Sequence, residues 1–235
     1  MKLFLENAYA REAEATVLAV TEGGILLDRT IFYANSGGQP GDTGTIDGTA
    51  IIDTRKGPED TILHIPAPGA ALPAVGDRVG LALDWDRRHR HMRMHTTLHL
   101  LCALLPGIYA TGNQIGADKS RLDFDLPDPP AKEDLTERLN ALIAQAHPIG
   151  TRWITGDELD AKPDLVRTLS VQPPRGAGQV RLVRIGAEDA PIDLQPCGGT
   201  HVANTAEIGR AEISKIENKG KQNRRLHIIL TGEKP

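Results

Sequence analysis

Residues 84–105 read DWDRRHRHMRMHTTLHLLCALL, and the character of the chain changes at this stretch. It contains no glycine or proline, it begins with acidic residues that suit a helix N-terminus, and Pro106 and Gly107 follow it. The pattern predicts one long helix. This helix divides a β-rich region before it from a region of mixed helices and strands after it.

The residues before the helix predict short strands separated by turns. Glycine, proline or aspartate lies between the β-rich pieces, which are residues 17–20, 24–32, 44–52, 61–65 and 78–83. Strands of this length and spacing indicate a small β-barrel or a compact sandwich.

The residues after the helix show both helical and strand patterns. Apolar residues at helical spacing predict a helix over 134–146, and Pro163 interrupts a shorter helical pattern over 156–169. The expected strands are residues 179–185, 211–216 and 225–230.

These patterns predict an α+β fold in two parts. An N-terminal small β-barrel domain is expected over residues 1–86, and an α+β domain over residues 87–235. Their boundary falls near the start of the long helix.

Composition limits the classes of protein to consider. The 27 basic and 31 acidic residues among 235 give a net charge of −4, which argues against non-specific coating of nucleic acid but not against a local basic patch. Two cysteines cannot form a disulfide framework and favour a reducing compartment. There is no apolar run of about 18 residues, and Glu6 interrupts the N-terminal apolar stretch. We expect a cytoplasmic protein without a signal peptide or membrane association.

Two short motifs together indicate a metal site. His95 and His99 lie four residues apart within the predicted helix, so both imidazoles face one side and can bind one cation. Far along the chain, CGGTH places Cys197 and His201 around a glycine turn. One cysteine and three histidines favour Zn²⁺ by their softness and geometry. We predict one Zn²⁺ per chain, held by His95, His99, Cys197 and His201.

Ordinary structural roles also fit these residue types. Paired helical histidines occur by chance, and an unpaired cysteine is often an inert core residue. Cys102 competes with Cys197 as a ligand, but it lies about 10.5 Å along the helix axis from His95, so we expect it in the core. The helix reads HTTLH and lacks the glutamate base of HExxH zinc peptidases, which disfavours a peptidase.

Five segments carry a resemblance to a known family. They are FYANSGGQPGDTG (residues 32–44), DRRHRHMRMHTTLHLL (86–101), NQIGADKSRLDFDL (113–126), QPCGGTHV (195–202) and EIGRAEISKIENKGKQNRR (207–225). In this order, they make the chain resemble the freestanding alanyl-tRNA editing proteins, the AlaX family, in its medium form. That family is related to the editing domain of alanyl-tRNA synthetase, so the resemblance implies an editing domain of the threonyl/alanyl-tRNA synthetase type after the barrel. The length has no room for a class II aminoacylation domain, and we expect no use of ATP.

The resemblance implies a reaction and a partner. The expected activity is zinc-dependent deacylation of tRNA(Ala) mischarged with serine, with glycine as the second candidate, which protects the fidelity of translation. The predicted catalytic residues are the zinc ligands His95 and His99 together with Gln114, a polar residue that can orient water or substrate but cannot act as a base. The oligomeric state stays open.

Other residues are predicted to distinguish the serine ester from the alanine ester. A site that hydrogen-bonds the serine hydroxyl disfavours alanine, whose methyl leaves the partner group unpaired. The candidates are Gly37, Gly38, Gln39, Thr43, Thr96 and Thr97. Ser36 stands where freestanding members often have a third glycine, which puts the local backbone in question if that position needs a positive φ.

Basic residues cluster beside both ligand motifs. Such runs are usually solvated faces, but this placement favours contacts to the tRNA acceptor stem. The predicted tRNA-binding residues are Arg87, Arg88, Arg90, Arg93, Lys219, Lys221, Arg224 and Arg225.

Two other functions fit the same motifs. In a zinc-stabilised RNA-binding module without turnover, the four ligands would only hold the fold together. A zinc hydrolase of small esters or amides is the third possibility, and the basic clusters make it less attractive. Four protein ligands are typical of a closed structural zinc site, whereas catalysis requires an open coordination position. One displaceable ligand, or a zinc that mainly orients substrate and water, would reconcile the two.

Overall fold

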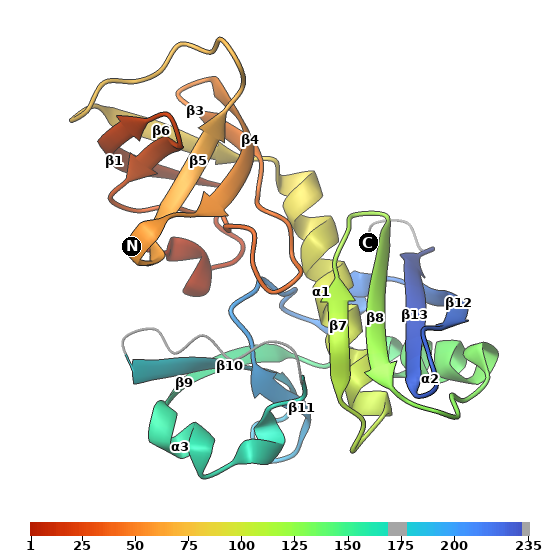
Figure 1. Ribbon diagram of the computed structural model, residues 1–235. Coiled ribbons are helices and arrows are strands. Elements are labelled where there is room, and N and C mark those ends of the chain that lie inside the picture. The colour runs from red at the N-terminus through yellow and green to blue at the C-terminus, as the bar shows by residue number, and fades with distance from the viewer. Residues whose placement is uncertain (169–177, 232–235) are drawn as a thin grey trace. The chain divides into compact units, whose positions relative to one another are not determined.

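The computed structural model describes residues 1–168 and 178–231 (Figure 1). The chain divides into two compact units, Met1–His91 and Met92–Pro235. The division falls inside the long helix, five residues beyond the expected boundary at 86/87. This helix, α1 (Trp85–Leu104), is confirmed almost to the residue, because no glycine or proline interrupts it before Pro106.

The first unit contains the predicted β-barrel. Its six strands close in the order β1-β2-β5-β4-β3-β6, and every neighbouring pair is antiparallel. The strands are β1 (Glu12–Thr21), β2 (Gly24–Leu27), β3 (Gly44–Ile46), β4 (Thr49–Lys56), β5 (Ile62–Pro66) and β6 (Arg78–Leu83). Aliphatic side chains and Phe32 fill the barrel.

Two of the expected strands differ from those observed. The strand predicted over residues 44–52 is a hairpin, because Asp47 and Gly48 both take positive φ angles, of 44° and 79°, and turn the chain between β3 and β4. The strand expected over 24–32 ends at Leu27.

The barrel unit also buries a charged pair. Arg88 is 0% exposed, and its guanidinium pairs with Asp42, with Nε 2.9 Å from Oδ2. Nη1 and Nη2 donate to the carbonyls of Ala8 and Ile31. Arg88, predicted to contact tRNA, is instead a buried residue whose charge Asp42 balances, so it presents no charge to a phosphate.

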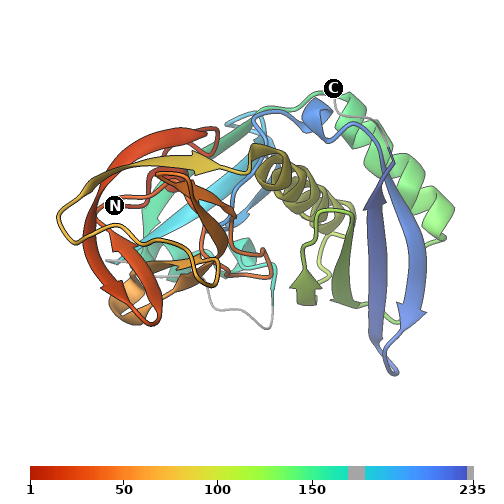
Figure 2. The ribbon, with the colours of Figure 1, turned by 90° about the horizontal axis from the view of Figure 1, so that it is seen from above.

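In the part of the second unit that the structure describes, the chain forms two sheets and two α-helices besides α1 (Figures 1 and 2). One sheet has the order β11-β10-β9 and the other β12-β13-β8-β7. The strands are β7 (Ala110–Gln114), β8 (Lys119–Asp125), β9 (Ile149–Thr155), β10 (Gln179–Gly186), β11 (Pro191–Pro196), β12 (Ala211–Asn218) and β13 (Asn223–Leu230). The strands β10, β12 and β13 were predicted, whereas β7, β8 and β9 were not.

The helices of this unit are α2 (Lys132–Ala144) and α3 (Gly156–Asp160). The apolar positions of α2 confirm the predicted helix over 134–146, shifted by two residues toward the N-terminus. The helical pattern over 156–169 gives only α3 and a 3₁₀ turn at Pro163–Leu165, and its last residue lies outside the described chain. No helix in the part of the chain that the structure describes has the length and hydropathy to cross a bilayer.

The three-stranded sheet has two different faces. Helix α3 lies against one face of this sheet (Figure 1), where Leu159 packs with Val180, Leu182 and Leu194. The opposite face carries the alternate residues, because side chains point to opposite sides along a strand. In the register of this sheet, Arg181 pairs with Trp153, and Ile185 pairs with Asp193. This second face positions the site described next.

Candidate metal centre

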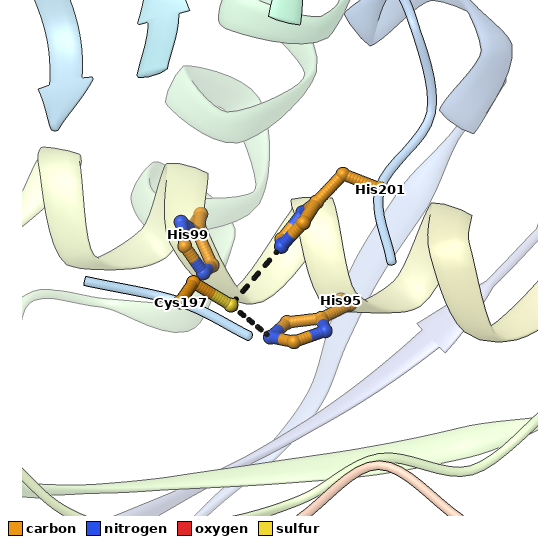
Figure 3. A group of neighbouring side chains, drawn as sticks. All are labelled: His95, His99, Cys197 and His201. Atoms are coloured by element: carbon orange, nitrogen blue, oxygen red, sulfur yellow. Dashed lines mark hydrogen bonds between the residues drawn. The ribbon is translucent and has the colours of Figure 1, made fainter. Parts of the chain in front are cut away.

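Four potential ligands meet in the second unit (Figure 3). His95 and His99 lie one turn apart on α1, and Cys197 and His201 come from the loop that follows β11. Their ligand atoms all lie within 4.8 Å of one another. The three histidines are buried and Cys197 is half-buried. The structure therefore brings together all four residues that the sequence predicted as ligands.

The spacing of these atoms fits a tetrahedral cation. Cys197 Sγ lies 3.5 Å from His95 Nε2 and 3.3 Å from His201 Nε2. In a zinc site with Zn–S of about 2.3 Å and Zn–N of about 2.0 Å, neighbouring sulfur and nitrogen ligands lie about 3.5 Å apart. One thiolate and three imidazoles are also the donor types that zinc prefers. The residues present therefore fit a Zn²⁺ ion.

A buried carboxylate orients His99. Its Nδ1 lies 2.9 Å from Asp193 Oδ2, and Asp193 is 4% exposed on β11. Gln195 Nε2 donates to the same oxygen at 2.9 Å and so holds the carboxylate in place. A carboxylate bound to Nδ1–H leaves Nε2 as the ligand atom and raises its basicity.

A hydroxyl performs the corresponding task for His201. Thr96 Oγ1 donates its one proton to the carbonyl of Met92 at 3.0 Å. The contact of 3.1 Å between this oxygen and His201 Nδ1 is therefore one in which the ring donates. This fixes the tautomer that turns the lone pair of His201 Nε2 toward Cys197.

Arg181 holds the loop that carries the thiol. From β10 its Nη1 donates to the carbonyls of Cys197 and Gly199, at 2.9 and 3.0 Å. The N–H of Cys197 donates to the carbonyl of Arg181 at 3.0 Å, which extends the β-ladder by one residue. A buried arginine thus fixes the glycine turn that carries the sulfur.

The protonation of the cluster suits a cation ligand set. Burial by itself raises the pKa of the Cys197 thiol, but the charges of His95 and His201 hold that pKa well below its ordinary value. Burial lowers the pKa of His99, yet hydrogen bonds to Asp193 and Cys197 outweigh it and raise that pKa to about 10. Binding a divalent cation therefore requires the departure of a proton from His99.

Cys102 shows the contrast with a functional cysteine. Its side chain is buried as predicted, at 6% exposure, and burial raises its pKa to about 12. A thiol with this pKa is not a nucleophile at neutral pH, and Cys102 is not one of the four residues that converge on the candidate metal site.

Comparisons with known proteins give matches in both units of the chain. Residues 180–227 match the family described as the threonyl and alanyl tRNA synthetase second additional domain, and residues 3–87 match class II (A) tRNA synthetases. Alanyl-tRNA editing protein AlaX-M from Methanosarcina acetivorans is 37% identical over 97% of this chain and 98% of its own. The chain belongs to the AlaX-M family.

The chain is also similar to a second AlaX-M protein and to part of a ligase. AlaX-M from Methanosarcina mazei is 39% identical over 97% of this chain and 95% of its own length. The alanine–tRNA ligase of Pyrobaculum aerophilum is 35% identical over 92% of this chain but only 25% of the ligase. The AlaX-M chain is thus similar to one part of a much longer ligase.

Two predicted discriminating residues of the AlaX-M chain have other roles. Thr96 and Thr97 are both 0% exposed. Thr96 bonds Met92 and His201, as described above, and Thr97 donates to the carbonyl of Arg93 at 2.9 Å. Their hydroxyls are bonded inside the protein rather than presented to a serine ester.

The glycine-rich segment lies in the barrel unit. Gly37 and Gly38 take positive φ angles of 56° and 85° in the turn, whereas Ser36 is not among the residues with positive φ. Serine therefore fits its position without backbone strain. Gln39 is buried, and Thr43 Oγ1 donates to Asp84 at 3.2 Å.

Gln114 lies at the end of β7 and is exposed. Its Oε1 accepts a hydrogen bond from Arg121 Nε at 3.1 Å. Its neighbour Asn113 was not predicted as a site residue, but its buried Oδ1 has no hydrogen-bond partner among the residues that the structure describes. The alternation along β7 directs these two side chains to opposite faces of the sheet.

The predicted tRNA contacts differ in exposure. Arg93 is 4% exposed and donates to the carbonyl of Ile208. Its guanidinium therefore stabilises the second unit and is not presented to a phosphate. Arg225 pairs with Asp123 at 2.8 Å and keeps 22% exposure. Arg90 and Lys221 are exposed, and Lys219 is 3.5 Å from Glu217. Arg87 and Arg224 donate to backbone carbonyls and are half-buried.

Proposed function

We propose that this protein hydrolyses the ester that joins serine to the 3′ end of tRNA(Ala), with glycine as a second substrate and one bound Zn²⁺. The observation that carries the proposal is the convergence of His95, His99, Cys197 and His201 on one point, with Asp193 and Thr96 orienting two of the rings. The relatives named alanyl-tRNA editing proteins support the substrate class.

The chemistry of recognition explains why such a hydrolase is needed. A pocket that accepts alanine cannot strongly exclude the smaller glycine or the similar serine, because one missing or added small group changes binding by only about 1–3 kcal/mol. A second site that removes the wrong products restores the accuracy. A freestanding hydrolase supplies that second site without the aminoacylation domain.

The ligand set would hold the zinc, and the surrounding residues keep it in position. Bound Zn²⁺ polarises an ester carbonyl or lowers the pKa of a water toward about 7. Asp193 holds the proton of His99 Nδ1, so that Nε2 stays available as a ligand. Cys197 is half-buried and the three histidines are buried, so Cys197 is the most accessible residue of the four.

Gln114 is the proposed residue for orienting water or substrate. Its Oε1 is bonded to Arg121, so its amide nitrogen is the group that donates to an ester oxygen or a water. Gly37, Gly38, Gln39 and Thr43 stay the proposed discriminating residues. The proposed tRNA contacts are now the more exposed basic residues, Arg87, Arg90, Lys219, Lys221, Arg224 and Arg225.

The test compares deacylation of Ser-, Gly- and Ala-tRNA(Ala). We expect rapid release of serine, slower release of glycine and little release of alanine. Asp193→Asn should lower the deacylation rate and the zinc affinity by about 10- to 100-fold, because it removes the carboxylate that orients a ligand histidine. Asp189→Asn, an exposed residue in the loop before β11, is the matched control and should change neither.

The alternatives give different results in the same assay. Binding of tRNA(Ala) without release of any amino acid would indicate an RNA-binding module. Release from small esters alone would indicate a different hydrolase. Full deacylation by the zinc-free, folded protein would contradict the proposed role of the metal.

A further inference from the structure

A single row of residues crosses the three-stranded sheet beside the metal centre. Trp153 of β9 pairs with Arg181 of β10. Arg181 in turn faces Cys197, whose N–H donates to its carbonyl at 3.0 Å just beyond the last pair of β10 and β11. Adjacent strands lie about 4.8 Å apart, so the Trp153 backbone is about 10 Å from that of the ligand Cys197.

The side chains of Trp153 and Arg181 point to the same face of the sheet. Residues directly opposite in an antiparallel pair share a face. Arg181 uses this face to bind the carbonyls of Cys197 and Gly199. Ile154, the neighbour of Trp153 in β9, packs on the other face with α3. The indole therefore belongs to the side of the sheet that carries the site.

Trp153 is unusual among the aromatic residues of this chain. It is 49% exposed, whereas Phe4, Phe32, Tyr33 and Phe124 are buried. Only 3% of the residues are aromatic, so an exposed indole beside the candidate site suggests a role in binding rather than in the core. Indoles are effective stacking platforms, because every nucleobase has a π-face that they can cover.

We propose that Trp153 stacks on an unpaired base at the 3′ end of the RNA substrate. This inference rests on the proposed function, which places the reacting ester on the terminal ribose at the metal centre. The base of that nucleotide is attached to the ribose that carries the ester, so it lies beside the metal centre. Trp153 lies on the face of the sheet from which Arg181 holds the Cys197 loop.

The exposed neighbour of the indole on this face is polar rather than apolar. Thr151 lies on the same face as Trp153 and offers a hydroxyl. An unpaired RNA end combines a π-face with the hydroxyls of its ribose, which a tryptophan beside a threonine suits. A second copy of this chain adding to the β9 edge is the competing occupant, and the test below separates the two.

The chain has two tryptophans, which makes a direct binding test possible. Trp85 stacks against His89 in the barrel unit, and the variant Trp85→Phe leaves Trp153 as the sole indole. Titration with a short single-stranded RNA ending in CCA should quench the Trp153 fluorescence in a saturable way. The same RNA with an abasic 3′-terminal ribose should quench it less. Where Trp85→Phe fails to fold, the difference between wild type and Trp153→Phe gives the same signal.

Affinity and kinetics of variants then measure the contribution of stacking. Trp153→Ala should bind the CCA-ending RNA about 5- to 150-fold more weakly, and Trp153→Phe should recover part of the loss. In deacylation of Ser-tRNA(Ala), Trp153→Ala should raise KM and leave kcat close to wild type. Tyr109→Ala, at the other exposed aromatic of this unit, is the matched control and should change neither.

Three results would overturn the proposal. Unchanged fluorescence on RNA binding, an unchanged KM in Trp153→Ala, or a dimer that Trp153→Ala converts to a monomer would each contradict it. The RNA titration does not depend on turnover. A protein that binds RNA through Trp153 but releases no serine would refute the proposed function and leave the stacking contact standing. A Trp153→Ala variant that deacylates Ser-tRNA(Ala) normally would refute the stacking contact and leave the proposed function standing.

Discussion

The two units of this protein bury polar groups in opposite ways. In the barrel, Arg88 and Asp42 are almost fully buried and form an ion pair. The buried ring of His64 is hydrogen-bonded to the hydroxyl of Thr30 and the carbonyl of Ile25. In the second unit, one group of buried or half-buried residues instead brings three ring nitrogens and a sulfur within 4.8 Å of one another.

The difference shows which buried polar groups are satisfied within the chain and which suit an added cation. In the barrel every donor described above has an acceptor within the chain, so the cluster stabilises the fold without any addition. Around His95, His99, Cys197 and His201 the chain supplies lone pairs to a common centre, and a cation satisfies all of them at once. The same residue type, histidine, is hydrogen-bonded within the chain in one unit and offers candidate ligand atoms in the other.

Removal of a ligand should have the largest effect. Cys197→Ser should lose stoichiometric zinc, because the four-ligand set loses its only thiolate; zinc binding in small zinc domains amounts to about 10–16 kcal/mol. Zinc content by atomic absorption and competition with a chelator measure the change. Cys102→Ala, at the other cysteine, is the matched control and should bind zinc normally. Equal zinc affinity in Cys197→Ser and wild type would show that the sulfur is not a ligand.

Breaking the ion pair between Arg88 and Asp42 should have the next largest effect, on the stability of the barrel unit. Arg88→Ala leaves Asp42 buried without a partner, so the free energy of unfolding of the barrel should fall by about 3–5 kcal/mol. Hydrogen exchange of the β1–β6 amides measures this locally. Arg78→Ala, which removes an ion pair with Glu14 between side chains 78% and 68% exposed, should cost less than about 1 kcal/mol. Equal effects of the two variants would contradict the role assigned to Arg88.

Acid should weaken the barrel through His64 by a smaller amount. Burial lowers the pKa of His64 to about 4, against 6.5 for an unperturbed histidine. Between these values the unfolded chain binds the proton more readily, so the stabilisation is complete above pH 6.5 and is lost as the pH falls toward 4. The loss between pH 7 and pH 5 should be about 2 kcal/mol.

The measurement is amide exchange of the barrel strands at both pH values. His64→Gln should remove most of this pH dependence, although it also lowers stability at pH 7. His147→Gln, in the second unit, should keep the dependence. A barrel whose exchange does not change between pH 7 and pH 5 would show that His64 is not held neutral by burial.

Local patterns in the sequence predicted the elements whose residues act within one segment. The long helix and the ligands follow from the absence of glycine and proline and from two short motifs, which need no knowledge of distant contacts. Strand β7 could not be found this way, because ATGNQ has little intrinsic preference for a strand and forms one by pairing with β8. The charged strand β8 is likewise fixed by β13 on its other side.

The roles of individual side chains were harder to predict for the same reason. Arg88 belongs by sequence to a basic run, and only its contact with Asp42, 46 residues away, shows that it is buried. Thr96 was a candidate for sensing serine because it lies between the ligand histidines. Its contact with His201, 105 residues away, gives it the task of orienting a ligand.

The two-faced sheet of the second unit also limits how this chain can change in length. Along β10, Val180 and Leu182 face α3, while Arg181 faces the ligand loop. Deleting one residue from this strand would exchange the two faces, placing an arginine in the apolar cluster and a leucine beside the thiol. Insertions and deletions of single residues should therefore be excluded from β10. Even-numbered changes keep each side chain on its own face.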